Sequence, residues 1–155
     1  MRVKMLMGVA VLGLFFLLQD AHADNAILYE FDGSFEDATF LTKEAIIGQG
    51  LTIDYVSHVG EMLARTKNDV GGSKDIFQNA EAYLFCSASI SRRVMEKDPM
   101  NVAHCPYSVF VIQIPGDQTT GDEGKIFIGH RDLPDGAMQE VEDLLRKIAE
   151  EATSF

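Results

Sequence analysis

Basic residues and cysteines are both scarce in this chain of 155 residues, and the shortage of basic residues excludes whole classes of partner. Lys and Arg together number 13 against 24 Asp and Glu, so the formal net charge is −11. A chain this acidic repels phosphate backbones and anionic membrane surfaces, and it lacks the basic stripe that nucleic-acid binding requires. We therefore expect no nucleic acid among its partners.

The sequence also lacks several motifs of catalysis and cofactor attachment. No serine lies in a G-x-S-x-G pattern, and Gly71-Gly72 has neither the lysine nor the helix-opening glycines of a phosphate-binding loop. A C-x-x-C-H motif for covalent haem attachment is missing as well. We assign no catalytic residue from these patterns and expect a binding or accessory domain rather than an enzyme.

The first 23 residues have the layout of a cleavable signal peptide. Arg2 and Lys4 form a basic start, residues 6–18 are an apolar run, and Ala21-His22-Ala23 supplies the small-x-small cleavage pattern. The apolar run is shorter than the roughly 20 residues that span a bilayer, so an uncleaved anchor is the less favoured alternative. We expect residues 24–155 to form one periplasmic or secreted domain without stable membrane anchoring, and loss of the leader changes its net charge from −11 to −12.

Hydrophobic periodicity in residues 24–155 predicts strands mixed with helices. In the second predicted strand, Leu51, Ile53 and Tyr55 alternate and are expected on one side. Ser34 is a predicted helix cap, and Asp135 is expected to open the last helix. The fold class is α+β, a mainly antiparallel sheet with helices packed on one face. The predicted strands are 27–31, 51–56, 82–86, 107–114 and 125–130, and the predicted helices are 34–47, 60–67, 87–97 and one from residue 135.

Cys86 and Cys105 each lie at the edge of a predicted strand. If those strands are antiparallel neighbours joined by the helix between them, the cysteines lie within disulfide range. An even cysteine count in an exported protein favours a structural disulfide.

Two functional alternatives for the cysteines remain open. One is a haem or copper site in which Cys86 or Cys105 is assisted by His104 or by one of the methionines between them, Met95 and Met100. Neighbouring strand residues point to opposite faces, so His104 and Cys105 bind one metal only if the strand bends there. The other alternative is a thiol–disulfide redox protein, which needs an exposed cysteine of low pKa.

The remaining candidate binding residues are less specific. His58 ends the second predicted strand beside Ser57 and could face a cleft, although solvent exposure or a satisfied partial burial is the favoured explanation. His130 and Arg131 end the last predicted strand, where a cation could bind a carboxylate ligand. We carry His58, His104, His130 and Arg131 forward as possible ligand-binding residues.

An ordered set of segments resembles the domain-of-unknown-function family 302. The segments are residues 29–37, the run from Ile53 to Thr66, the stretch from Phe85 through Cys105 to Val111, and residues 128–131. The resemblance covers roughly Ala26 to Ala152. It implies an α/β domain of the TATA-binding-protein-like type that forms a homodimer, and it supplies no catalytic residues. Because relatives carry glycine and leucine at the two cysteine positions, Cys86 and Cys105 mark a branch of that family.

Overall fold

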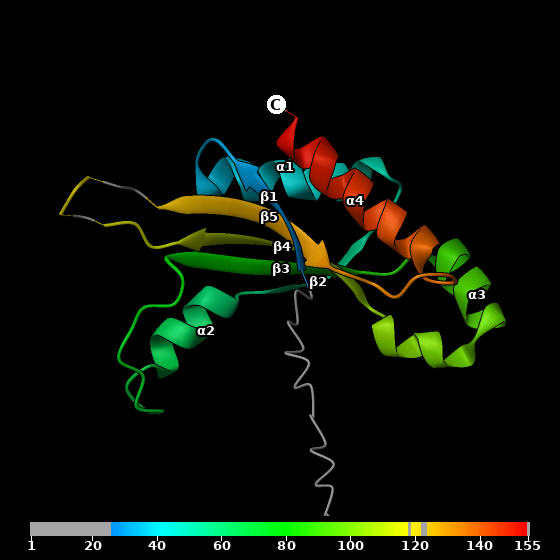
Figure 1. Cartoon of the computed structure of the whole chain (residues 1–155), viewed down its shortest axis with the longest axis horizontal. Helices are drawn as coiled ribbons and strands as arrows, with labels where there is room; N and C mark the ends of the chain where they lie inside the picture. The colour runs from blue at the N-terminus through cyan, green and yellow to red at the C-terminus, as the bar shows by residue number, and fades with distance from the viewer. Residues whose placement is uncertain (1–25, 118, 122–123, 155) are drawn as a thin grey trace, which may run out of the picture.

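A five-stranded antiparallel sheet forms the centre of this computed structural model, which describes residues 26–117, 119–121 and 124–154 (Figure 1). The predicted signal peptide, residues 1–23, lies outside the described residues. The sheet order is β1-β5-β4-β3-β2, and each neighbouring pair runs antiparallel. The strands are β1 (Ala26–Phe31), β2 (Ile53–Ser57), β3 (Asn79–Phe85), β4 (Tyr107–Ile114) and β5 (Lys125–Arg131).

Alternation along the strands gives the sheet one buried face. In β4 the residues Tyr107, Val109 and Val111 are buried while those between them are only partly covered. Cross-strand pairing continues this face, since Val109 lies opposite both Tyr83 and His130. Successive side chains of a strand point to opposite faces, so one set of side chains enters the core and the other set lines the opposite face.

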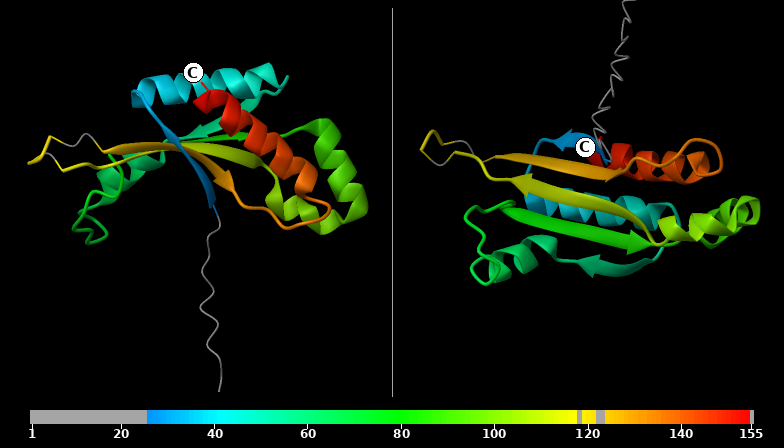
Figure 2. Two further views of the ribbon diagram at one scale, coloured as in Figure 1. Left: turned by 45° about the horizontal axis from the view of Figure 1, so that its top comes forward. Right: turned by 60° about the horizontal axis from the view of Figure 1, so that its bottom comes forward.

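Helices α1 (Phe35–Gly48) and α4 (Gln139–Thr153) cover the buried face, as Figures 1 and 2 show. The predicted cap of α1 is confirmed, because the Ser34 hydroxyl accepts a hydrogen bond from the Asp37 N–H at 3.0 Å. Ile46 of α1 and Ile148 of α4 are fully buried between the helices and the sheet. The expected α+β architecture, with helices on one face of an antiparallel sheet, is therefore confirmed.

The other two helices lie at the margins of the sheet. Helix α2 (Val59–Thr66) follows the short edge strand β2 and packs against β3. Gly60 makes this contact possible, because a Cβ there would lie 2.7 Å from the backbone nitrogen of Ala80. Helix α3 (Ala88–Lys97) and a 3₁₀ helix, η1 (Pro99–His104), connect β3 to β4. Within the described residues no helix covers the middle of the second sheet face (Figure 2, right). None of the described helices is long and apolar enough to cross a membrane.

Some local expectations were wrong. Tyr55 was expected on the same face of the sheet as Ile53. A register shift between these residues turns Tyr55 outward instead, where it is 63% exposed. The last helix begins at Gln139 rather than Asp135, because residues 135–138 form a turn. Strand β3 starts at Asn79, three residues before the predicted start, and η1 was not predicted.

Candidate functional site

The ends of β3 and β4 bring the two cysteines together. Phe85, the last residue of β3, lies opposite Tyr107, the first residue of β4. Cys86 follows Phe85, Cys105 precedes the start of β4, and their Sγ atoms are 2.9 Å apart. The expected adjacency is thus confirmed. Both residues are free thiols in the structure, so the disulfide itself stays a prediction.

The surroundings of Cys86 disfavour its thiolate. Burial is the main cause that raises the pKa of Cys86 to about 11, followed by its contact with Cys105 and the negative charge of Asp54. The N–H of Tyr107 acts in the opposite direction. Because the thiolate is the reactive form of cysteine, reduced Cys86 is a weak nucleophile near neutral pH.

The other soft donors predicted near the cysteines, Met95, Met100 and His104, do not form a site with them. Met95 packs against the hydrophobic core, and Met100 is 70% exposed. His104 lines cavities that do not include either cysteine. Among the described residues, no three His, Cys, Asp or Glu side chains gather as a metal site would require. The cysteine pair therefore offers two sulfur donors without a third protein ligand from this set.

His104 and Arg131, which are 27 positions apart in the sequence, meet at one cavity. It lies between the end of η1 and the loop after β5, has a volume of about 610 Å³, and is open to solvent. A smaller recess of about 20 Å³ adjoins these two residues. Glu142 fixes the loop, because its carboxylate accepts a hydrogen bond from the Leu133 N–H at 2.7 Å. The residues around the two spaces are His104, Pro106, Tyr107, Ser108, Arg131, Asp132, Leu133, Pro134 and Leu145.

His130 lies in the core and does not line this cavity. Its side chain is fully buried, its Nδ1 lies 3.0 Å from the carbonyl oxygen of Arg131, and its ring packs against Tyr29 at 6.0 Å between centroids. The neighbouring positions 130 and 131 thus have opposite surroundings, as expected for a strand. The structure places His130 in the sheet core and Arg131 at the surface.

His58 belongs to a third group, which lies where β2 ends and α2 begins. Its Nδ1 lies 3.1 Å from Oε1 of Glu81, and the Tyr83 hydroxyl donates to Oε2 of Glu81 at 2.5 Å. Burial and Glu81 together raise the pKa of Tyr83, which therefore stays protonated. A cavity of about 170 Å³ opens beside His58, between α2 and the start of β3. Sequence reasoning missed Glu81 as the partner of His58, because the predicted strand began at residue 82 and left Glu81 outside it.

Comparison with known proteins identifies the family. A family model described as "Domain of unknown function DUF302" matches residues 28–152. The chain belongs to the DUF302 family. Its fold is similar to that in the crystal structure of an uncharacterized conserved DUF302 protein from Bacillus stearothermophilus, with a TM-score of 0.62 and 13% identity. That match covers 84% of this chain and 99% of the other. Among curated proteins, no match is found.

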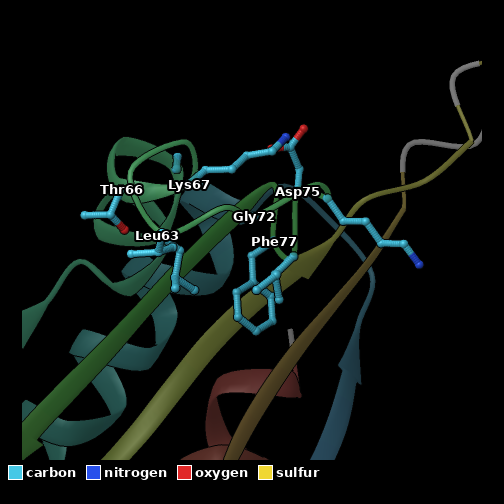
Figure 3. Close-up of a pocket in the computed structure, with 11 residues that line it drawn as sticks. Leu63, Thr66, Lys67, Gly72, Asp75 and Phe77 are labelled. Atoms are coloured by element: carbon cyan, nitrogen blue, oxygen red, sulfur yellow. The ribbon is translucent and has the colours of Figure 1, made fainter.

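A fourth feature of this DUF302 domain is a small pocket between α2 and the segment that leads into β3. Figure 3 shows Leu63 and Phe77 among the residues that surround it. An ion pair between Lys67 and Asp75, 2.8 Å long, joins its two walls. With a volume of about 80 Å³, the pocket is far smaller than the 300–1,000 Å³ that is common for ligand sites. We regard it as a packing feature of α2 and the following loop.

Proposed function

We propose that this DUF302 domain is an exported, non-enzymatic binding domain that acts as a homodimer and is stabilised by a disulfide between Cys86 and Cys105. The proposed periplasmic location rests on the signal-peptide pattern of residues 1–23. The observation that carries the proposal is the 2.9 Å distance between the two sulfur atoms. Disulfides form and persist in the oxidising compartment to which such a leader directs a protein.

Closing the bridge needs little rearrangement. A disulfide has an S–S length of about 2.05 Å, so the sulfur atoms approach by less than an ångström. The two thiols lose two protons and two electrons, and an oxidising protein disulfide of the periplasm accepts them and becomes a dithiol. The bridged positions differ by 19 in the sequence. A disulfide that closes a loop of this length stabilises the fold by roughly 3 kcal/mol, because it restricts the conformations of the unfolded chain.

The same residues give less support to the two alternatives. A haem- or copper-binding role needs donors beyond the two sulfur atoms, and the described residues do not gather His104 or another such side chain with them. A thiol–disulfide redox role needs a cysteine of lowered pKa, whereas the surroundings of Cys86 raise its pKa to about 11. Both alternatives remain distinct outcomes of the experiment below.

The second sheet face supports the homodimer. Leu28 and Ile114 on this face are 49% and 42% exposed, and Tyr55 is 63% exposed. On the same face, the side chains of Leu28 and Phe110 pack over Gly129. A Cβ added to Gly129 would lie 2.8 Å from Leu28 and 2.6 Å from Phe110. Exposed apolar side chains gathered on one face can mark an interaction site. A two-fold axis would pack the same patch against itself, as in most homodimers.

Native mass spectrometry of protein purified from the periplasm without reductant tests the proposal. We expect a chain that starts at Asp24, is two hydrogens lighter than its sequence mass, and is found as a dimer with no bound cofactor. The full thiol mass together with copper or haem would favour the carrier role instead. A mixture of oxidised and reduced chains that follows an added glutathione buffer would favour the redox role.

A Cys86→Ser variant provides the matched stability control. If the bridge is structural, the free energy of unfolding of the variant is roughly 3 kcal/mol lower than that of the oxidised protein. Addition of reductant to the wild type should produce a similar loss and leave the variant unchanged. Equal stability of the variant and the oxidised wild type would contradict the structural disulfide.

A further inference from the structure

We infer that the cavity at His104 and Arg131 binds the carboxylate of a small organic acid that has one negative charge and an apolar tail. This inference rests on the proposed binding function and adds the chemical class of the ligand. Three properties of the cavity carry it: an arginine without an ion pair, a histidine in the same lining, and apolar side chains beside these polar ones.

Arg131 is a cation at the cavity that forms no ion pair with any described residue. In the part of the chain that the structure describes, Arg92, Arg93 and Arg146 each form an ion pair with a carboxylate, whereas Arg131 forms none. Asp132 lines the same cavity and makes no hydrogen bond or ion pair with Arg131. A planar guanidinium at the edge of a cavity matches a carboxylate, which it can bind through two parallel hydrogen bonds.

His104 contributes a second polar group. Its Nδ1 is buried and has no hydrogen-bond partner. A proton on Nδ1 would bury an unsatisfied N–H group, and such groups are rare in proteins. The tautomer with its proton on Nε2 is therefore favoured. His104 and Arg131 line the same cavity, so this N–H is assigned as a second donor to the carboxylate that Arg131 binds.

The walls and the total charge restrict the rest of the ligand. Leu133 and Pro134 line the large cavity, and Leu145 closes the adjoining recess. The lining combines these apolar side chains with His104, Arg131 and Asp132, and small-molecule sites likewise combine apolar contacts with a few polar anchors. The net charge of −12 on residues 24–155 and the carboxylate of Asp132 repel anions with several charges. These features select a monocarboxylate with a short apolar chain over a phosphate or a dicarboxylate.

Titration calorimetry with sodium hexanoate, performed on the oxidised mature protein, tests the inference. We expect saturable binding of hexanoate, with little binding of 1-hexanol, which has the same chain without the charge. Arg131→Gln should weaken hexanoate binding at least about tenfold, because charge-assisted hydrogen bonds are lost. Arg65→Gln is the matched control, since Arg65 also lacks an ion pair but lies on α2, outside this cavity. It should leave hexanoate binding unchanged.

Two variants of His104 test the donor. His104→Gln retains an N–H donor and should bind hexanoate within a few fold of the wild type, whereas His104→Leu should bind about tenfold more weakly. Melting curves of all variants verify that the fold is retained. Absence of saturable hexanoate binding, equal binding of 1-hexanol, or equal effects of Arg131→Gln and Arg65→Gln would overturn the inference. The disulfide and the dimer are measured on the same samples without hexanoate, so failure of the proposed function is scored separately.

Discussion

At the residue scale, hydrogen-bond partners decide what each histidine of the described chain can do. His130 is enclosed by the core and does not line the cavity at His104; its Nδ1 lies 3.0 Å from the Arg131 carbonyl oxygen, and its buried Nε2 has no partner among the described residues. His58 is held by Glu81 at the sheet edge, and His104 has a buried nitrogen without a partner beside a cavity. These three side chains could not be ranked from the sequence, because burial and hydrogen-bond partners depend on residues far apart in the chain.

The Cys86 thiol should titrate late in the reduced protein. Cys86 has its pKa raised to about 11, mainly by burial and by Cys105. The folded state therefore retains the proton more strongly than the unfolded chain, and the reduced protein loses stability as the pH rises from about 9 toward 11. Iodoacetamide alkylation of Cys86 against pH measures this shift, and Cys105→Ala should move the midpoint downward. A wild-type midpoint at or below 9 would contradict the prediction.

Tyr83 should be worth more to stability than an ordinary tyrosine hydroxyl. It is fully buried, and its hydroxyl donates to the Glu81 carboxylate. Tyr83→Phe leaves that carboxylate oxygen without its partner, so we expect a loss of about 1.5–3 kcal/mol in the free energy of unfolding. Urea denaturation measures it, with the exposed Tyr55 as the control: Tyr55→Phe should cost close to nothing. Equal effects of the two substitutions would show that the hydroxyl of Tyr83 contributes no special stability.

At the element scale, close approach of α2 to β3 depends on a single glycine. Alanine is the better helix former by about 1 kcal/mol, but Gly60→Ala would place a Cβ 2.7 Å from the Ala80 nitrogen. Overpacking typically costs about 1–3 kcal/mol, so we expect a net loss of stability in urea denaturation. Gly48→Ala in α1 is the control, because its Cβ would meet only a Glu151 side-chain oxygen at 3.6 Å. A Gly60→Ala protein as stable as Gly48→Ala would refute this account of the contact.

Elements with a strong local signal were predictable, and those shaped by neighbours were not. Strand β4 was predicted with both bounds correct, because residues 107–114 are rich in β-branched and aromatic residues and lie between Pro106 and Pro115. The outward turn of Tyr55 depends on a register shift against β3, which local alternation does not reveal. The candidate site shows the same limit: the strand pattern indicated that Cys86 and Cys105 would be close, but the meeting of His104 with Arg131 depends on η1 and on the loop after β5.

At the scale of the whole molecule, the uncovered sheet face should be the dimer interface. Leu28 is 49% exposed there, and its side chain and that of Phe110 both pack over Gly129. In a two-fold dimer, Leu28→Glu introduces one added charge from each copy into the apolar contact, and residues 24–155 of each chain already carry a formal net charge of −12. Desolvating these unpaired carboxylates opposes association. We expect the variant to be monomeric and folded.

Light scattering coupled to size-exclusion chromatography measures the mass of each species, and circular dichroism verifies the fold. Ile47→Glu is the matched control, because Ile47 is 54% exposed but lies on α1, in the helical layer that covers the opposite face of the sheet. A dimer that survives Leu28→Glu and dissociates with Ile47→Glu would assign the interface to the helices instead. A monomeric wild type would remove the dimer from the proposed function. The hexanoate test would be unaffected, because the residues around its cavity all come from one chain.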